Sequence, residues 1–308
     1  MVVNQENAYL QAANVEDENQ FKDENQFNAE KPLQLEKPLQ LEKQLKFEKK
    51  WAVAASTSAI DFIASQLPDF SKSQLKKVMN IGGTWLIRKG KTTIMRKAQK
   101  PLEAGDQVAL YYDEKLLSEK PLTPICLVHE HHYSIWVKPA NMVSQGSVYS
   151  DHLSLFRIVE QLLNRSCFLV HRLDREVHGL VIMAHTVQAA AEFSAYFRDN
   201  RIQKRYQAVV LGQLHAQDID LPIDGKNALT RCQPLSFDEK TNQTLVDISI
   251  ETGRKHQIRK HLGSVGHPVM GDPLYGKGNK NQEGLQLIAT ELSFFDPWKK
   301  QKCHFVCP

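Results

Sequence analysis

The stretch His171-Arg172-Leu173-Asp174-Arg175 decides how this sequence is interpreted. Two apolar runs, 168–170 and 180–184, bracket it and predict two buried strands joined by a polar loop. The loop therefore holds a carboxylate between two arginines on a rigid platform. Neighbouring guanidinium groups favour the ionised form of Asp174, which suits attack on a sugar carbon or stabilisation of positive charge there. Taken alone, the stretch also fits a surface ion-pair network.

Three further segments follow this loop in order. The first begins at Phe197-Arg198 and continues through Lys204-Arg205-Tyr206 into a strand. The second is Thr252-Gly253-Arg254-Lys255-His256-Gln257-Ile258-Arg259, which joins a strand to a helix. The third is Gly271-Asp272-Pro273-Leu274-Tyr275-Gly276. Together with the loop around Asp174, these segments resemble the ordered motifs of the RluA-type pseudouridine synthases over about residues 124–297.

The resemblance implies a fold class, an activity and a set of site residues. The fold class is α+β, with a mixed, largely antiparallel sheet in the catalytic domain. The activity is isomerisation of specific uridines to pseudouridine in structured RNA, without a cofactor or a metal. Asp174 matches the family's catalytic aspartate, which acts at C1′ of the uridine. Tyr206 matches the tyrosine that stacks on the flipped base, and Arg259 matches the basic partner of the aspartate.

Five more residues are candidate substrate-binding residues by the same resemblance: Arg172, Arg254, Lys204, His256 and Lys138. Arg172 matches a residue that holds open the space left by the extruded base. Arg254 is the alternative to Arg259 as partner of the aspartate, and Lys138-Pro139 matches a lysine-proline pair at the end of an early strand.

The chain departs from the family motif beside the catalytic loop. Val177-His178-Gly179 stands where the family has Thr-Ser-Gly, so two hydroxyl groups are missing. Val177 cannot replace their hydrogen bonds, whereas His178 can supply one. The departure leaves a second function open, that of a catalytically weak or inert RNA-binding or ribosome-assembly factor with the same fold.

The chain ahead of the catalytic domain (124–308) divides into three parts. Residues 1–50 are low-complexity and contain a drifting six-residue unit, which predicts a flexible tail. Residues 51–113 predict a small helix–helix–strand domain, with Ser71 capping its second helix and Gln74 completing a capping box. It resembles the S4 RNA-binding domain. Residues 114–123 are polar and predict a linker.

The domain at 51–113 carries nine basic residues between Ser71 and Lys100, with no acidic residue among them. A local field of one sign is typical of phosphate binding, and a solvated lysine-rich face is the alternative. The predicted RNA-binding residues are Lys72, Lys76, Lys77, Arg88, Lys89 and Lys91.

Composition sets the remaining expectations. The chain has 308 residues, a net charge of +4 and 42% hydrophobic residues, which is ordinary for a soluble protein of about two domains. The sequence has no apolar run of membrane-spanning length and no signal-peptide pattern, and its five cysteines are scattered, so we expect a cytoplasmic protein. The expected partner is RNA, ribosomal first and transfer RNA as the alternative, and the expected state is a monomer. His129-Glu130-His131-His132 is not predicted to bind metal, because consecutive residues cannot share one face of a regular element.

Overall fold

The computed structural model of the protein describes residues 45–308. Residues 1–44 of the tail predicted at 1–50 lie outside the described residues. The last residues of that predicted tail belong to a strand. Strand β1 (Lys46–Ala52) pairs antiparallel with β6 (Gln107–Asp113). Phe47 in β1 stacks on Tyr112 in β6, with ring centroids 5.1 Å apart. The globular part therefore begins before Trp51, because Phe47 and Trp51 of this strand both pack against the core of the lobe.

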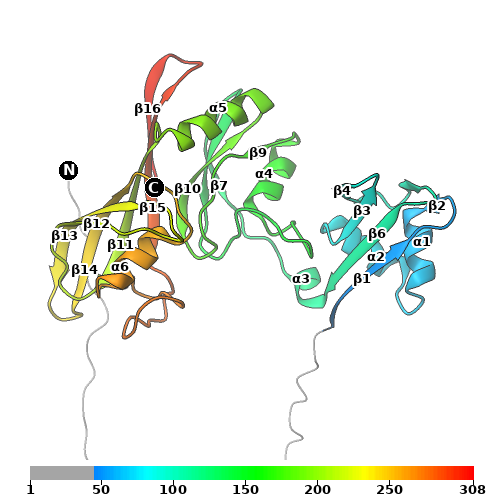
Figure 1. Ribbon diagram of the computed structural model, residues 1–308, viewed down its shortest axis with the longest axis horizontal. Coiled ribbons are helices and arrows are strands. Elements are labelled where there is room, and N and C mark those ends of the chain that lie inside the picture. Colours follow the sequence, from blue (N-terminus) through cyan, green and yellow to red (C-terminus); the bar gives the residue numbers. More distant parts are fainter. Residues whose placement is uncertain (1–44) are drawn as a thin grey trace, which may run out of the picture. The chain divides into compact units, whose positions relative to one another are not determined.

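The N-terminal lobe, residues 46–113, has a four-stranded antiparallel sheet in the order β1-β6-β3-β4, with two helices (Figure 1). Its other elements are β2 (Thr57–Ser58), α1 (Ala59–Gln66), α2 (Lys72–Asn80), β3 (Thr84–Arg88), β4 (Lys91–Ile94) and β5 (Pro101–Leu102). The predicted capping box at α2 is confirmed, because Ser71 Oγ accepts from the Gln74 amide while Gln74 Oε1 accepts from the Ser71 amide. Apolar residues of both helices and of the sheet form one core.

The segment predicted as a linker contains a short helix, α3 (Glu114–Ser118). Asp113 begins this helix by accepting a hydrogen bond from the Leu116 amide. Residues 119–124 then lead into the large sheet without regular structure.

The rest of the chain is built on one ten-stranded sheet, in agreement with the predicted α+β class (Figure 1). The main strand order is β12-β13-β14-β11-β15-β10-β8-β7, with β16 paired to β15 and β9 paired to β10. The strands are β7 (Ile125–His129), β8 (Tyr133–Lys138), β9 (Phe168–Leu169), β10 (His178–Ala184), β11 (Gln203–Leu211), β12 (Gln217–Asp220), β13 (Leu229–Asp238), β14 (Gln243–Ile250), β15 (Leu287–Asp296) and β16 (Gln301–Val306). The helices are α4 (Leu155–Leu163), α5 (Val187–Arg198) and α6 (Gln257–Ser264).

Both faces of the central strands are buried. Along β10, Val181 and Met183 belong to the core that includes residues of α4 and α6. The intervening Leu180 and Ile182 belong to the core that includes Phe193 of α5. A strand covered on both sides has a continuous apolar sequence, which is why 180–184 could be recognised from the sequence.

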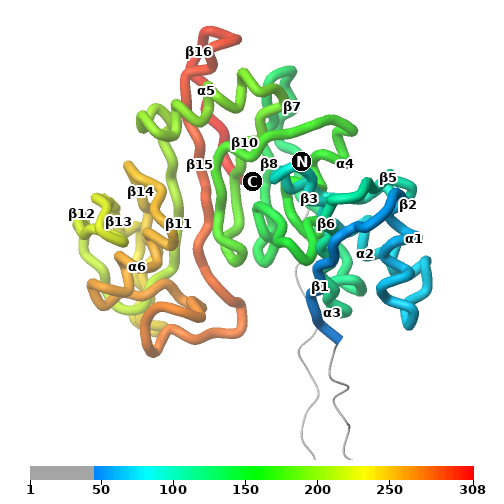
Figure 2. Tube along the Cα trace, turned by 45° about the vertical axis from the view of Figure 1, so that its right-hand side comes forward, coloured from blue at the N-terminus to red at the C-terminus, as the bar shows by residue number. Residues whose placement is uncertain are grey.

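Strand β15 runs between β10 and β11, although it lies about a hundred residues beyond β10 in the chain (Figure 2). Its pairing with β11 is antiparallel, and its pairing with β10 is parallel. Gly179 allows the close approach to β15, because its φ is +124° and an added Cβ would lie 2.3 Å from the Ala289 carbonyl oxygen. The loop that carries Asp174 leads directly into this contact.

Candidate active site

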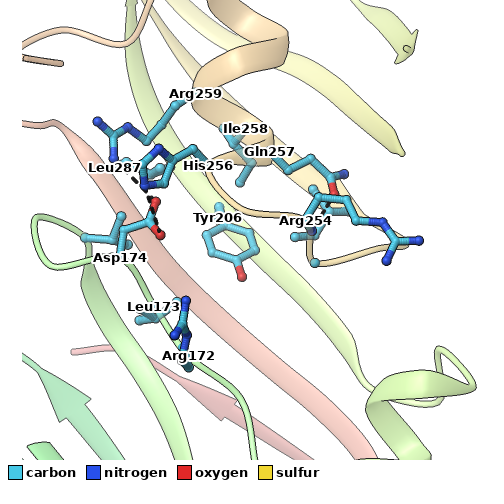
Figure 3. Close-up of a pocket in the computed structure, with 13 residues that line it drawn as sticks. Arg172, Leu173, Asp174, Tyr206, Arg254, His256, Gln257, Ile258, Arg259 and Leu287 are labelled. Carbon is cyan, nitrogen blue, oxygen red and sulfur yellow. Dashed lines mark hydrogen bonds and ion pairs between the residues drawn. The ribbon is translucent and has the colours of Figure 1, made fainter. Parts of the chain in front are cut away.

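One pocket collects six of the residues predicted from the sequence (Figure 3). They are Asp174, Tyr206, Arg259, Arg172, Arg254 and His256. The loop between β9 and β10 supplies Arg172 and Asp174, and β11 supplies Tyr206. The segment from the end of β14 into α6 supplies the other three. Segments far apart in the sequence therefore place a carboxylate, an aromatic ring and several cations around one space.

Asp174 has a separate partner for each carboxylate oxygen (Figure 3). Arg259 Nη1 lies 3.4 Å from Oδ2, and His256 Nε2 lies 3.8 Å from Oδ1. The carboxylate keeps 25% of its exposure, whereas the Arg259 side chain keeps 1%. The structure thus buries this charged side chain of α6. The buried guanidinium and the His256 ring therefore fix the position of a carboxylate that stays partly open to the pocket.

Arg259 is held by a second carboxylate, that of Asp272. Its Nε and Nη2 donate to the two oxygens of Asp272, at 2.7 and 2.8 Å. Asp272 is fully buried and also accepts from the amides of Leu274 and Tyr275. This bidentate pair leaves Nη1 of Arg259 directed at the loop that carries Asp174, where Glu176 Oε2 lies 3.6 Å from the same Nη1 atom. Asp272 and Glu176 were not assigned a role from the sequence, although Asp272 stands in the motif Gly271–Gly276.

His256 has a backbone conformation that is uncommon for a residue with a side chain. Its φ is +55°, at the N-cap of α6. Its Nδ1 lies 2.9 Å from the Tyr275 hydroxyl, while its Nε2 faces Asp174. Burial lowers the pKa of His256, and the negative charge of Asp174 works in the opposite direction. Non-glycine residues held in this region of φ cluster at functional sites, which fits the place of His256 beside Asp174.

Tyr206 lies between Asp174 and Arg254 in the pocket (Figure 3). Burial, and then the negative charge of Asp174, raise the pKa of Tyr206 well above its usual value. Its hydroxyl therefore stays protonated near neutral pH, while the ring offers an apolar wall of the pocket.

Two arginines of the pocket remain exposed, Arg172 and Arg254. The second is placed by Gln257, whose buried side-chain oxygen accepts from the Arg254 amide and from the Thr252 hydroxyl. The Gln257 amide nitrogen donates to the Leu229 carbonyl, which ties this loop to β13. An exposed guanidinium on a fixed loop can bind a phosphate of a ligand.

Lys138 and Lys204, which the sequence had suggested as substrate-binding residues, are buried and do not line the pocket. Burial lowers the pKa of each to about 8. The Lys138 ammonium donates to the carbonyl oxygens of Pro139, Met142 and Arg175, at 3.0, 2.8 and 3.1 Å. Its three protons are thus used inside the protein, and the structure gives Lys138 a supporting role under the loop that carries Asp174.

Ser144 also holds the loop that carries Asp174 through hydrogen bonds. The Ser144 hydroxyl donates to the Leu173 carbonyl at 2.7 Å and accepts from the Leu173 amide at 3.1 Å. His178, at the departure from the family motif, lies half-buried with Nε2 3.7 Å from the Cys307 sulfur. Val177 is buried and lines the pocket, so an apolar side chain stands there where the family has a hydroxyl.

The predicted RNA-binding residues of the N-terminal lobe separate into two groups. Lys72 is paired with Asp61 at 2.6 Å. Arg88 donates to both oxygens of Asp106, at 2.8 and 2.7 Å, and to Glu103 at 2.9 Å. The acids come from outside the basic stretch, so the stretch itself did not reveal them. The exposed remainder is Lys76, Lys77, Lys89 and Lys91.

Neither a metal-binding cluster nor a membrane-spanning helix occurs in the described part of the chain. Between residues 45 and 308, no group of three or more His, Cys, Asp or Glu side chains is arranged to hold a metal ion. Within the same residues, no helix is long and apolar enough to cross a membrane.

Comparison with known proteins relates this chain to a family. The model of the RNA pseudouridylate synthase family matches residues 132–264. A protein of Aquifex aeolicus named as an uncharacterized RNA pseudouridine synthase is 31% identical over 274 residues, covering 77% of this chain and 85% of that protein. The ribosomal large subunit pseudouridine synthase C of Vibrio cholerae is 28% identical, with 80% of this chain and 90% of the relative covered. The tRNA pseudouridine synthase C of the same organism is also 28% identical, with 57% and 87% covered.

Solved structures agree with the fold. The human RNA pseudouridylate synthase domain containing 1 matches with a TM-score of 0.53 at 20% identity, covering 62% of this chain and 86% of the other. The human RNA pseudouridylate synthase domain containing 4 matches with a TM-score of 0.50 at 22% identity, covering 59% and 87%.

Proposed function

The chain belongs to the RNA pseudouridine synthase family, and from that premise we propose that it isomerises specific uridines of ribosomal RNA with Asp174 as the catalytic carboxylate. The observation that carries the proposal is the convergence of Asp174, Tyr206 and Arg259 on one pocket. These are the residues that the ordered sequence motifs had matched to the family's catalytic set.

The extent of the relatives' similarity favours ribosomal over transfer RNA. The match to the ribosomal synthase of Vibrio cholerae covers 80% of this chain, a larger share than the catalytic domain at 124–308 makes up. The match to the transfer RNA synthase covers 57%, a smaller share than that domain makes up. The N-terminal lobe is thus a feature that the ribosomal relative shares in part.

The reaction exchanges one bond at C1′ of the uridine for another. The C1′–N1 bond breaks with its electron pair going to the uracil, the uracil turns, and C5 bonds to C1′. The proton on C5 is lost, and N1 gains a proton. Asp174 acts at C1′ as nucleophile or as the negative charge beside a cationic sugar carbon. Its exposure of 25% leaves the carboxylate accessible from the pocket.

The surrounding residues divide the remaining work. Arg259 and His256 hold the two oxygens of Asp174 in place. The target base must leave its stack to enter the pocket, at a cost of a few kcal/mol, and stacking on Tyr206 returns about 1–3 kcal/mol. Arg172 and Arg254, exposed on the pocket lining, bind phosphates and so fix the strand without reading its sequence.

The N-terminal lobe is proposed as an S4-like RNA-binding module. Its helix–helix–strand order and the exposed lysines Lys76, Lys77, Lys89 and Lys91 support this role. Arg88 is excluded from the proposed contact surface because Asp106 and Glu103 already engage it, whereas Lys72 stays in the proposal because its ion pair with Asp61 is exposed and weak. A monomeric state and a cytoplasmic location stay predictions from the sequence.

A second function stays open because Val177 and His178 stand where the family motif has two residues with hydroxyl groups. The buried Val177 removes a hydroxyl from the wall next to Asp174, so a catalytically weak RNA-binding or ribosome-assembly factor is the alternative.

Tritium release from ribosomal RNA labelled with [5-³H]uridine tests the proposal, because the C5 proton is lost only when the base is rejoined through C5. The wild type should release tritium, Asp174→Asn should not, and Asp218→Asn at an exposed position outside the pocket should match the wild type. Primer extension after carbodiimide treatment then maps the modified uridine. Tight RNA binding without release from ribosomal or transfer RNA would establish the alternative.

A further inference from the structure

A second hollow lies beside the catalytic pocket and has no part in the mechanism above. It is formed by Gln145, Phe156, residues 167–172 and Ala190, and we call it the side pocket. It contains about 980 Å³ of space not filled by atoms, part of it open to solvent. Phe156 and Phe168 on its wall are only partly buried. Apolar surface left open in a concave site is typical of ligand binding.

The side pocket adjoins the catalytic pocket at Arg172. Arg172 lines both, and Asp174 is only two residues further along the same loop. Gln145 lines the side pocket and also a groove that includes Asp174 and Lys255. A ligand segment with one unit at Asp174 therefore passes Arg172 and Gln145 on its way to the side pocket.

The walls of the side pocket are preformed. Phe168 is in β9, where it pairs with Ala184 of β10. The His171 ring accepts a hydrogen bond from the Ile182 amide at 2.9 Å and lies 4.4 Å from the Phe197 ring centroid. Gln145 follows Ser144, which is bonded twice to the catalytic loop. A rigid site of this kind binds without first ordering its own walls.

The chemistry of the lining matches a nucleobase. Aromatic and aliphatic side chains offer flat apolar contact to a ring, and single-stranded bases are recognised by stacking on such surfaces. Gln145 is exposed at the rim and carries both a donor and an acceptor for a base edge. Arg172 supplies a positive charge where a phosphate would pass, and the lining residues of this described hollow include no Asp or Glu. A nucleotide combines a flat ring with a phosphate, and it therefore matches both the apolar walls and Arg172.

We propose that the side pocket receives the base of a nucleotide adjacent to the target uridine, with Phe168 as a stacking surface and Gln145 reading its edge. The proposal rests on the proposed function, because the neighbouring base is defined by the uridine held at Asp174. When the target base is extruded, its neighbour loses a stacking partner, and the side pocket replaces that contact. Specificity for the sequence around the target then comes from this site in addition to the shape of the RNA.

The test uses the full chain and a stem-loop RNA that contains the mapped target uridine. Three RNAs are compared: the intact one, one with an abasic ribose on the 5′ side of the target, and one with an abasic ribose on the 3′ side. The proteins are the wild type, Phe168→Ala, Phe168→Leu and Gln145→Ala. Leu162→Ala, at a residue of α4 that is 58% exposed and outside the side pocket, is the matched control.

Removing the base on one side should lower kcat/KM of the wild type about 5- to 150-fold, the range expected for one stacked base. Phe168→Ala should lower kcat/KM on intact RNA by a similar factor, and Phe168→Leu, which preserves apolar packing, should lie between. The two losses should not multiply, because Phe168→Ala on the abasic RNA removes a contact already gone. Leu162→Ala should match the wild type on all three RNAs.

A binding measurement keeps the result independent of catalysis. With Asp174→Asn as the background, 2-aminopurine next to the target should change its emission on binding, and adding Phe168→Ala should abolish that change. The proposal is overturned if the wild type modifies intact and both abasic RNAs equally, or if the losses from Phe168→Ala and base removal multiply. Failure of the proposed function looks different, because the wild type would then modify no uridine in the intact RNA.

Discussion

Asp272→Asn should uncouple the buried guanidinium of Arg259 from the rest of the protein. The new carboxamide would keep an oxygen for the amides of Leu274 and Tyr275 and for Nη2 of Arg259, but would turn an N–H toward Nε of Arg259. Arg259 is 1% exposed, so water cannot replace the lost carboxylate. Removing one partner of a buried ion pair costs about 3–5 kcal/mol of folding stability. The preserved amide contacts and the nearby Glu176 should keep the loss for this variant at about 3 kcal/mol.

Urea unfolding measures this loss, and tritium release measures its effect on the reaction. The unfolding midpoint should fall with an unchanged m-value, and kcat should fall because Arg259 no longer holds its position beside Asp174. The double variant Arg259→Met/Asp272→Asn should regain at least half of the lost stability, because no buried charge remains unpaired. It should stay inactive. A variant Asp272→Asn within about 0.5 kcal/mol of the wild type, or a double variant as unstable as the single one, would refute the reasoning.

Three further predictions concern the supports of the catalytic loop and the N-terminal lobe. Burial lowers the pKa of Lys138 to about 8, so between about pH 8 and 10.5 the unfolded chain binds a proton that the folded chain has lost. The free energy of unfolding should therefore rise with pH in that window by up to about 3 kcal/mol. Urea titrations at about pH 7.5, 9 and 10.5 should show that Lys138→Met lacks this part of the rise. Gly179→Ala should lower the free energy of unfolding by about 3 kcal/mol, since a Cβ would press on the Ala289 carbonyl at a positive φ, and a melting curve like that of the wild type would contradict this. The double variant Lys89→Gln/Lys91→Gln should weaken RNA binding and reduce its salt dependence, with little change in melting temperature. Arg88→Met should instead lower the melting temperature, because it removes the ion pair with Asp106. Equal effects of the two variants on RNA binding and stability would contradict the division into exposed and paired residues.

The parts of the structure that depend on local pattern could be predicted from the sequence. The capping box at Ser71 and the apolar run at 180–184 follow rules that act within one element, and the structure confirms both. The catalytic pocket was accessible in a different way, through motifs whose order and spacing had been matched to a family. Neither route required knowledge of which residues touch across the fold.

The remainder depends on contacts between distant segments. Arg88 belongs to an uninterrupted basic stretch, yet Asp106 neutralises it from the turn that precedes β6. The sequence suggests Lys138 as a substrate-binding residue, but three carbonyl oxygens from two loops surround it. Asp272 lies 13 residues beyond Arg259, and only the path of the chain after α6 brings their side chains together. Pairings of this kind have no period in the sequence.

The placement of β15 between β10 and β11 has a consequence for synthesis on the ribosome. Ribosomes make the chain from its N-terminus, so β10 and β11 emerge long before residues 287–296. Until β15 arrives, the edges of both earlier strands lack their final neighbour, and unpaired edges invite wrong pairing with other chains. The interval between emergence of β11 and of β15 is therefore the stage at which the nascent protein is most exposed to aggregation and most open to a chaperone. Slowing translation after β11 has emerged and before β15 emerges should lengthen that interval and lower the yield of folded protein.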